Sequence, residues 1–260
     1  KVLFILLLVF AVNSASVAKE LSRWAATDYL IASFVDIALN NEYSAKQSRV
    51  RKWTGPVRYY FSHRVADQQL HEQLSTLHLQ HLADITDVDI QRVKQKNKAN
   101  LLIVFSTEKR LEKELLSEFR IKSKKQRNQL FRNSVCLAHF SINADSSIRK
   151  AIVIIPVDRA RAHAKLVSCV VEELTQIMGL PNDSEKVFPS IFNDKSFNDL
   201  LTGLDYLLLK LLYHPEVKVG MTKTRVKPVL TKIINRFKGK GLVVNAEEKV
   251  MEGGLYPLLY

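Results

Sequence analysis

The sequence predicts an α+β fold, built on one mixed β-sheet with an antiparallel strand at its edge. Three observations support this class. Segments of strand character alternate along the chain with amphipathic segments of helical period. Two strand-like segments flank residues 143–147, whose composition is typical of a hairpin turn. The 260 residues, 47% of them hydrophobic, are enough to bury the core of one domain of ordinary size.

The first half of the chain contains four predicted elements. Apolar residues at helical spacing predict helices over residues 19–41 and 66–83. Residues 53–62 alternate apolar and polar side chains and are rich in β-formers, which predicts a strand. Residues 99–105 form a short continuous apolar run, which is typical of a buried parallel strand.

The second half begins with a charged helical insertion over residues 108–132 and continues with the two strands of a hairpin, 135–142 and 150–155. A long helix is predicted over residues 161–178, followed by a polar loop over 181–194. Further helices are expected over residues 197–213 and around 226–237.

The N-terminal segment 1–18 has the features of a secretory signal peptide. A positive residue is followed by a short apolar run and then by small residues before Lys19. We therefore expect an exported protein, periplasmic or secreted, with no transmembrane span after signal removal. An uncleaved N-terminal anchor is the alternative interpretation of this segment.

The chain is strongly basic, with a formal net charge of +13, concentrated in residues 109–132 and 218–240. Both stretches also carry apolar residues at helical spacing, so solvated basic helix faces are the simplest explanation. No aromatic-interleaved stacking pattern accompanies them, and we expect no nucleic-acid partner. In an exported protein, a peptide or an anionic envelope polymer is the expected partner.

One helical segment has the spacing of a zinc metallopeptidase motif without its histidines. In the HExxHxxGxxH pattern, two histidines one helical turn apart bind zinc, a glutamate acts as general base, and a glycine turns the chain back toward a third ligand. Here the corresponding positions are held by Glu172, Glu173, Gln176 and Gly179, with Asn182 or Asp183 in the third-ligand position.

These residues and the order of elements resemble the zincin fold of the metzincin peptidases, particularly the matrixin-like branch. Residues 201–213 look like the matrixin terminal helix. The chain is also similar to an uncharacterised family of exported bacterial proteins with a Glu-Glu-x-x-Gln motif and a Gly-Leu-x-Asn-Asp turn. The resemblance implies a twisted sheet above the motif helix. It places an N-terminal helical segment at 19–50, a zincin-like domain at 51–240 and a C-terminal tail at 241–260.

The chemistry of the motif allows several interpretations. All three metal-ligand positions differ from the zincin pattern, so we expect no metal and no other cofactor, with zinc or another divalent cation as the alternative. Glu172, Gln176 and Asp183 form an oxygen-rich set that suits a hard cation better than zinc. Glu172 and Gln176 could instead hydrogen-bond each other and the turn, or the whole polar stripe could face solvent.

Two histidines elsewhere in the chain, His214 and His139, are candidates for additional site residues. His214 is the best placed, because it directly follows a Leu-Tyr pair at the end of a predicted helix. His139 lies in the predicted edge strand. His71, His78 and His81 share one face of a leucine-rich helix and are expected at the edge of the core or on the surface.

The sequence contains two cysteines, Cys136 and Cys169. In an exported protein an even number of cysteines suggests a disulfide, with two buried thiols as the alternative. The zincin resemblance implies that this bond joins the edge hairpin to the motif helix.

The leading functional interpretation is a non-catalytic binding or scaffold domain of the cell envelope with a degenerate zinc motif. An atypical peptidase-like hydrolase with Glu173 as general base is the alternative. A weaker alternative is a carboxylate-based hydrolase of envelope polysaccharide, with Glu172 and Glu173 working with Asp183. The sequence does not decide whether the protein is an enzyme.

Overall fold

A computed structural model describes residues 23–39 and 49–260. The predicted signal peptide, 1–18, lies outside these residues. Of the helix predicted over 19–41, the described part is α2 (Thr27–Leu39), whose side chains Leu30, Phe34 and Ile37 are fully buried.

The sheet has five strands in the order β2-β1-β3-β5-β4. β4 is antiparallel to β5 and lies at the edge, whereas the other pairs are parallel, which confirms the predicted fold class. The short strand β2 was not predicted, because it has three residues and two of them are exposed. The strands are β1 (Val57–His63), β2 (Ile90–Arg92), β3 (Leu101–Ser106), β4 (Leu137–Ile142) and β5 (Ile148–Pro156).

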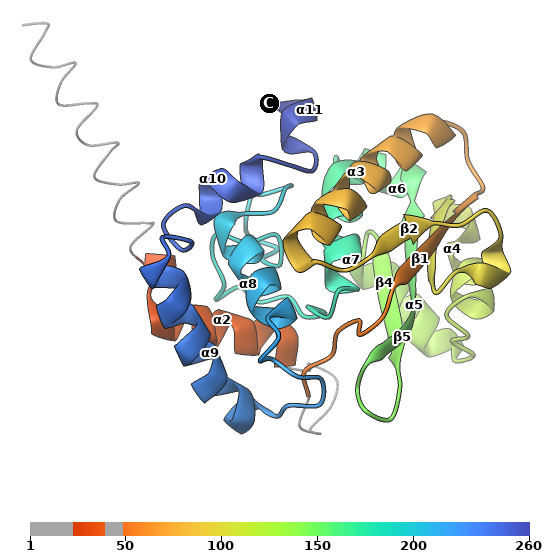
Figure 1. The fold of residues 1–260 in the computed structure, drawn as a ribbon. Helices are drawn as coiled ribbons and strands as arrows, with labels where there is room; N and C mark the ends of the chain where they lie inside the picture. The colour runs from red at the N-terminus through yellow and green to blue at the C-terminus, as the bar shows by residue number, and fades with distance from the viewer. Residues whose placement is uncertain (1–22, 40–48) are drawn as a thin grey trace, which may run out of the picture.

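Helices cover both faces of the sheet (Figure 1). One face, which includes Ile103 and Val153, packs against α3 (Gln68–Thr86) and α7 (Leu166–Gln176) in the main core. The opposite face, which includes Leu102 and Ile154, packs against α4 (Glu108–Ser117) in a second, smaller core. Burial on both faces explains why β3 is apolar from Leu101 to Phe105.

The charged insertion consists of two helices, α4 and α5 (Lys124–Asn133). The predicted helical character is confirmed, but the break between them was not predicted. α4 ends at Ser117, and the chain passes through a left-handed backbone conformation at Arg120 before α5 begins.

The single helix predicted over 161–178 is wrong, because the chain forms α6 (Val157–Ala162) and then α7. Ala164 adopts a left-handed conformation with φ 53°, and the Lys165 amide donates to the Ala160 carbonyl at 2.7 Å. This arrangement ends α6. Glycine is the usual residue at such a position. Because this position is an alanine, the sequence carries no signal that a helix ends here.

The C-terminal part of the chain is helical. α8 (Gly203–Tyr213) begins later than predicted, because Thr202 and Asp205 form a capping box at its start. α9 (Lys223–Gly239) includes the helix expected around 226–237, and η1 (Lys96–Lys98) is a single 3₁₀ turn. The tail contains two short helices that were not predicted, α10 (Ala246–Met251) and α11 (Tyr256–Leu259). In Figure 1, α8 lies beside α2, α9 and α10.

A disulfide joins Cys136, directly before β4, to Cys169 in α7, with a Cα–Cα distance of 5.9 Å. It confirms the predicted pairing, and the interpretation as two free thiols is wrong. None of the helices in the described part of the chain is both long and apolar enough to cross a membrane.

Candidate functional site

The glycine of the motif is fixed by a very close backbone approach. Gly179 has φ 113°, and a Cβ atom at this position would lie 2.0 Å from the Arg51 carbonyl oxygen. The preceding carbonyl, that of Met178, accepts a hydrogen bond from the Tyr213 hydroxyl at 2.8 Å. Glycine is therefore required here both by its backbone conformation and by the space available.

The loop that follows the motif is held at two points. Near its start, the Asn182 side-chain amide donates to the Ile37 carbonyl at the end of α2, at 2.9 Å. Farther along, the buried Asp205 carboxylate accepts from the Ser190 hydroxyl at 2.6 Å and from the Ile191 amide at 3.1 Å. Asn182 therefore serves to anchor the loop, and its side chain does not join the motif residues.

The loop brings Asp183 onto the polar stripe of α7. The Gln176 Nε2 donates to the Asp183 Oδ1 at 3.0 Å. The charge of Asp183 also acts on both Glu172 and Glu173. We call these four residues the carboxyl cluster. The structure thus brings together four of the predicted site residues, with Gln176 bonded to Asp183 and not to Glu172.

The two glutamates of the carboxyl cluster favour their protonated forms. Burial raises the pKa of Glu172 to about 8, helped by the nearby Asp183 and Asp194 and opposed by Lys165. Burial also raises the pKa of Glu173 well above its ordinary value, and the charges of Glu172 and Asp183 add to this effect.

The environment of Glu173 is unusual for a carboxyl group. Its side chain is buried, and its Oε2 atom has no hydrogen-bond partner among the described residues. An unpartnered buried carboxyl strongly favours the neutral form, because an ionised one would be neither solvated nor paired. Its burial also means that the polar stripe of α7 does not simply face solvent, since Glu173 lies within the interior.

The cluster does not have the composition of a zinc site. In the described part of the chain, no group of three or more His, Cys, Asp or Glu side chains is arranged to hold a metal ion. Gln176 directs its amide N–H groups to Asp183, and an N–H group is not a metal ligand. The donor set therefore does not fit the zinc that the motif spacing implies.

His214 lies away from the carboxyl cluster, at the end of α8. Its Nδ1 accepts from the Glu216 amide at 3.2 Å, and its ring contacts Phe237 edge-on at 6.0 Å between centroids. Burial, followed by the charge of Arg236, lowers the pKa of His214. These interactions give it a local role at the start of the segment leading to α9.

The histidines of α3 are more deeply buried than expected. His71, His78 and His81 all belong to the interior. His78 Nε2 lies 2.9 Å from the Thr175 hydroxyl of α7, and burial lowers the pKa of His78 to about 3. The prediction of core-edge or surface positions is therefore wrong, because α3 packs directly against the motif helix.

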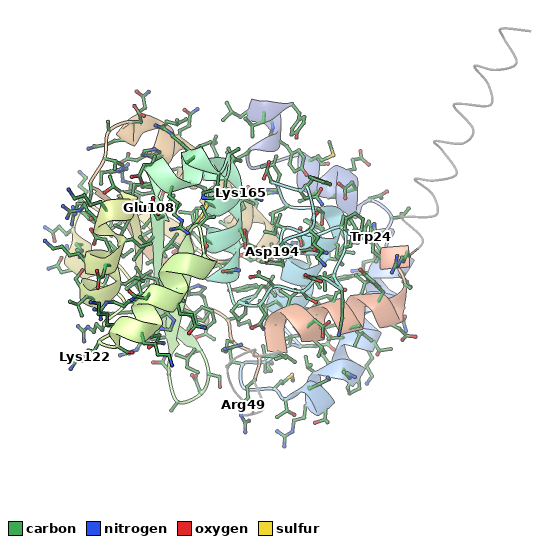
Figure 2. The ribbon with its side chains drawn as sticks, turned by 180° about the vertical axis from the view of Figure 1, so that it is seen from behind. Trp24, Arg49, Glu108, Lys122, Lys165 and Asp194 are labelled. Carbon is green, nitrogen blue, oxygen red and sulfur yellow. A yellow bond between two sulfur atoms is a disulfide. The ribbon has the colours of Figure 1, made fainter. Side chains whose placement is uncertain are left out.

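Two charged residues that influence the cluster were not identified from the sequence. Lys165 precedes Glu172 by seven residues, a spacing that places them on one helical face and could have indicated their interaction. Asp194 comes from the loop, where no periodic pattern connects it to α7. Figure 2 shows both residues in the central part of the molecule.

One of the three comparisons with known proteins gave a match. A family model described as "Protein of unknown function (DUF2927)" matches residues 27–232. No curated protein and no solved structure matches the chain significantly. The family match extends from α2 into α9 and includes the carboxyl cluster.

Proposed function

The chain belongs to the DUF2927 family, and we propose that it is an exported, zincin-like binding or scaffold domain whose motif helix is non-catalytic. The proposal of export is supported by the apolar N-terminal segment in the sequence and by the Cys136–Cys169 disulfide, a bond typical of exported proteins. The order of the sheet, the motif helix and the helix after the loop supports the zincin likeness.

The hydrogen bond between Gln176 and Asp183 carries the non-catalytic part of the proposal. It joins the second ligand position directly to the third, so two side chains that would bind a metal in a peptidase satisfy each other instead. The arrangement keeps the turn and the helix in place. Gln176 is half-buried and Asp183 is exposed, so the pair stabilises the turn by the modest amount of a solvent-accessible hydrogen bond.

The state of Glu173 supports the same conclusion. A general base must be ionised at the working pH, whereas burial, helped by the charges of Glu172 and Asp183, raises the pKa of Glu173 well above its ordinary value and so favours its protonated form. Without a cation to stabilise its anion, Glu173 is a poor base for activating water.

For the partner, we favour an extended peptide over an anionic polymer at the outer edge of β4. This strand lies at the end of the sheet, and no described strand pairs with its outer edge. An edge strand offers backbone donors and acceptors that an extended peptide can pair with. An anionic envelope polymer is the second partner class, suggested by the charge of the chain.

The proposal is tested by peptide hydrolysis and metal binding. We expect purified protein to carry no stoichiometric zinc and to show no hydrolysis of an unstructured peptide library, with or without added Zn²⁺. Glu172→His, Gln176→His and Asp183→His together restore the ligand types of the zincin pattern. This triple variant should bind Zn²⁺, which the wild-type protein should not.

Two controls separate the parts of the proposal. Gln176→Ala should lower the free energy of unfolding by about 1 kcal/mol, the typical net contribution of a hydrogen bond. Gln129→Ala, an exposed position in α5, should change it by less than about 0.5 kcal/mol. A folded triple variant without zinc affinity would contradict the zincin likeness, and metal-dependent turnover in the wild-type protein would contradict the scaffold.

A hydrolase is the second candidate function, favoured by the unpartnered Oε2 atom of Glu173. A buried carboxyl with a raised pKa is typical of catalytic groups. If this candidate is correct, the wild-type protein hydrolyses peptides and Glu173→Gln abolishes the reaction while the protein remains folded. A polysaccharide hydrolase ranks third, since an acid–base pair needs pKa values that are pushed apart, whereas those of Glu172 and Glu173 are both raised.

A further inference from the structure

The insertion leaves an open pocket on the face of the sheet opposite to α7. α4 packs on Leu102 and Ile154 and so covers part of this face. The pocket lies beside the part that α4 covers. It has a volume of about 490 Å³. Its walls come from the segment around η1, from the residues that join α4 to α5, and from β4 and β5. We call it the insertion pocket.

The strand register explains the floor of this pocket. Leu102 of β3 is paired with Ile152 of β5, and Ile152 is paired with His139 of β4, so the three side chains lie in one row on one face. Ser141 and Lys150 form the next row on the same face. The floor is therefore apolar in the middle of the sheet and polar toward its edge.

Cationic side chains from three separate segments line the insertion pocket. The residues are Lys96, Arg120, Arg149 and Lys150, together with one carboxylate, Glu118. Lys96 is paired with Glu118 at 2.8 Å, which joins two walls of the pocket. Among the described residues, no carboxylate forms an ion pair with the other three cations. The pocket thus has an excess of positive charge, with four cationic side chains and one carboxylate in its lining.

One of these cations, Arg120, has an unusual backbone conformation. Arg120 has φ 56°, in the left-handed region that favours glycine. It follows the end of α4, where glycine is the common residue and would be less strained. The chain instead has an arginine at the strained position, beside Phe119, whose ring contacts that of His139 at 5.7 Å between centroids.

From these observations we infer that the insertion pocket binds a phosphate-bearing anionic ligand. Arginine and lysine side chains that converge from different segments can surround a compact group with more than one negative charge. The planar guanidinium groups of Arg120 and Arg149 match the oxygens of a phosphate, and Lys150 adds a third positive charge. A neutral ligand would leave these charges uncompensated.

The insertion pocket is independent of the motif helix, because the two lie on opposite faces of the sheet. Loss of phosphate binding would therefore leave the proposal for the carboxyl cluster unaffected, and the reverse is also true. In Figure 2 the insertion, marked by Glu108 and Lys122, forms one end of the molecule, far from Trp24 at the other end.

The inference is tested by titrating the full chain with inorganic pyrophosphate in a calorimeter at fixed ionic strength. We expect saturable binding at one site. Arg149→Gln combined with Lys150→Gln should weaken it by about tenfold or more, because two charge-assisted contacts are lost. The matched control, Arg225→Gln with Lys232→Gln, removes the same charge from exposed positions on α9 and should change the affinity by less than about twofold.

Three results would overturn the inference. One is the absence of saturable pyrophosphate binding. Another is an equal loss of affinity in both double variants, which would show that the net charge of the protein and not the pocket attracts the anion. The last is tighter binding of citrate, a carboxylate of comparable charge, which would exclude phosphate as the preferred group. Thermal unfolding of both double variants establishes that they are folded.

Discussion

The charged side chains on the two faces of the sheet differ in burial and in pairing. On the α7 face, the Glu173 carboxyl is buried, and Gln176 donates a hydrogen bond to the exposed Asp183. On the insertion face, Arg149 and Lys150 remain exposed and have no ion-pair partner among the described residues. One face of the sheet therefore carries polar groups that take part in the packing of the fold. The other face carries polar groups that are accessible to a ligand.

If the residues on the α7 face are closely packed, Gly179→Ala should lower the free energy of unfolding more than the other substitutions described below. The added Cβ would meet the Arg51 carbonyl and would also strain a backbone that favours glycine. We expect a loss of about 3–5 kcal/mol in the free energy of unfolding, measured in urea. Gly239→Ala in α9 is the control, because a Cβ there meets no atom within 4 Å and should change stability by less than about 1 kcal/mol. Equal effects of the two substitutions would show that the motif turn is not tightly packed.

The disulfide is the second test of the same face. Removing it through Cys136→Ser and Cys169→Ser opens a loop of sequence separation 33 and should lower the free energy of unfolding by about 3–4 kcal/mol. Urea unfolding measures this loss, and treatment of the wild-type protein with reductant should reproduce it. A wild-type protein that reacts with thiol reagents under denaturing, non-reducing conditions would refute the bond.

The third test measures how the stability contributed by Glu173 depends on pH. Folding raises the pKa of this acid, so the folded state binds the proton more tightly than the unfolded state. The resulting stability is present below the ordinary pKa of 4.5 and is lost as the pH rises toward the raised value. Glu173→Gln imitates the protonated form and should gain about 1–3 kcal/mol over wild type at pH 8, with little gain at pH 4.

The control for this titration is Glu248→Gln, at an exposed position on α10. Its stability difference from wild type should be nearly independent of pH. Both variants are measured by urea unfolding at pH 4, 6 and 8. A Glu173→Gln variant that is destabilised at pH 8 would mean that the glutamate is ionised and paired in the folded protein.

Substitutions on the insertion face should have the smallest effect on the free energy of unfolding. Arg149→Gln with Lys150→Gln should change the free energy of unfolding by less than about 0.5 kcal/mol, because exposed unpaired charges contribute little to stability. Measured beside pyrophosphate affinity, this result would sharpen the contrast between the faces. A loss above about 2 kcal/mol would instead show that these cations hold the strand edge together.

Periodicity and hairpin composition predicted the sheet class, because β1, β3, β4 and β5 are each long enough to show their pattern. They did not predict β2, which is short and exposed, or the break at Ala164, where no glycine marks the end of α6. The spacing of the motif correctly grouped Glu172, Glu173, Gln176 and Asp183. It did not predict the position of His214, because its orientation depends on how α8 and α9 pack.

Burial was the least predictable property of the site. A helical projection places Glu173 on a polar stripe, and such a stripe normally faces water. Here Glu173 is buried, and the loop that follows α7 brings the charge of Asp183 close to it. This loop is held by Asp205 and by the contact of Asn182 with α2. These partners lie far away in the sequence and have no periodic signal, so the raised pKa values follow only from the three-dimensional structure.

The bond between Cys136 and Cys169 has a consequence for how any partner at β4 would bind. It ties the edge strand to the helix that carries the carboxyl cluster. The spacing between these two elements is therefore set by a covalent bond before any ligand arrives, and hinge-like opening between them is prevented. A partner that pairs with β4 would meet a strand whose position is already fixed, and binding would not carry the entropy loss of ordering that strand. Recognition should therefore depend on complementary shape more than on induced adjustment.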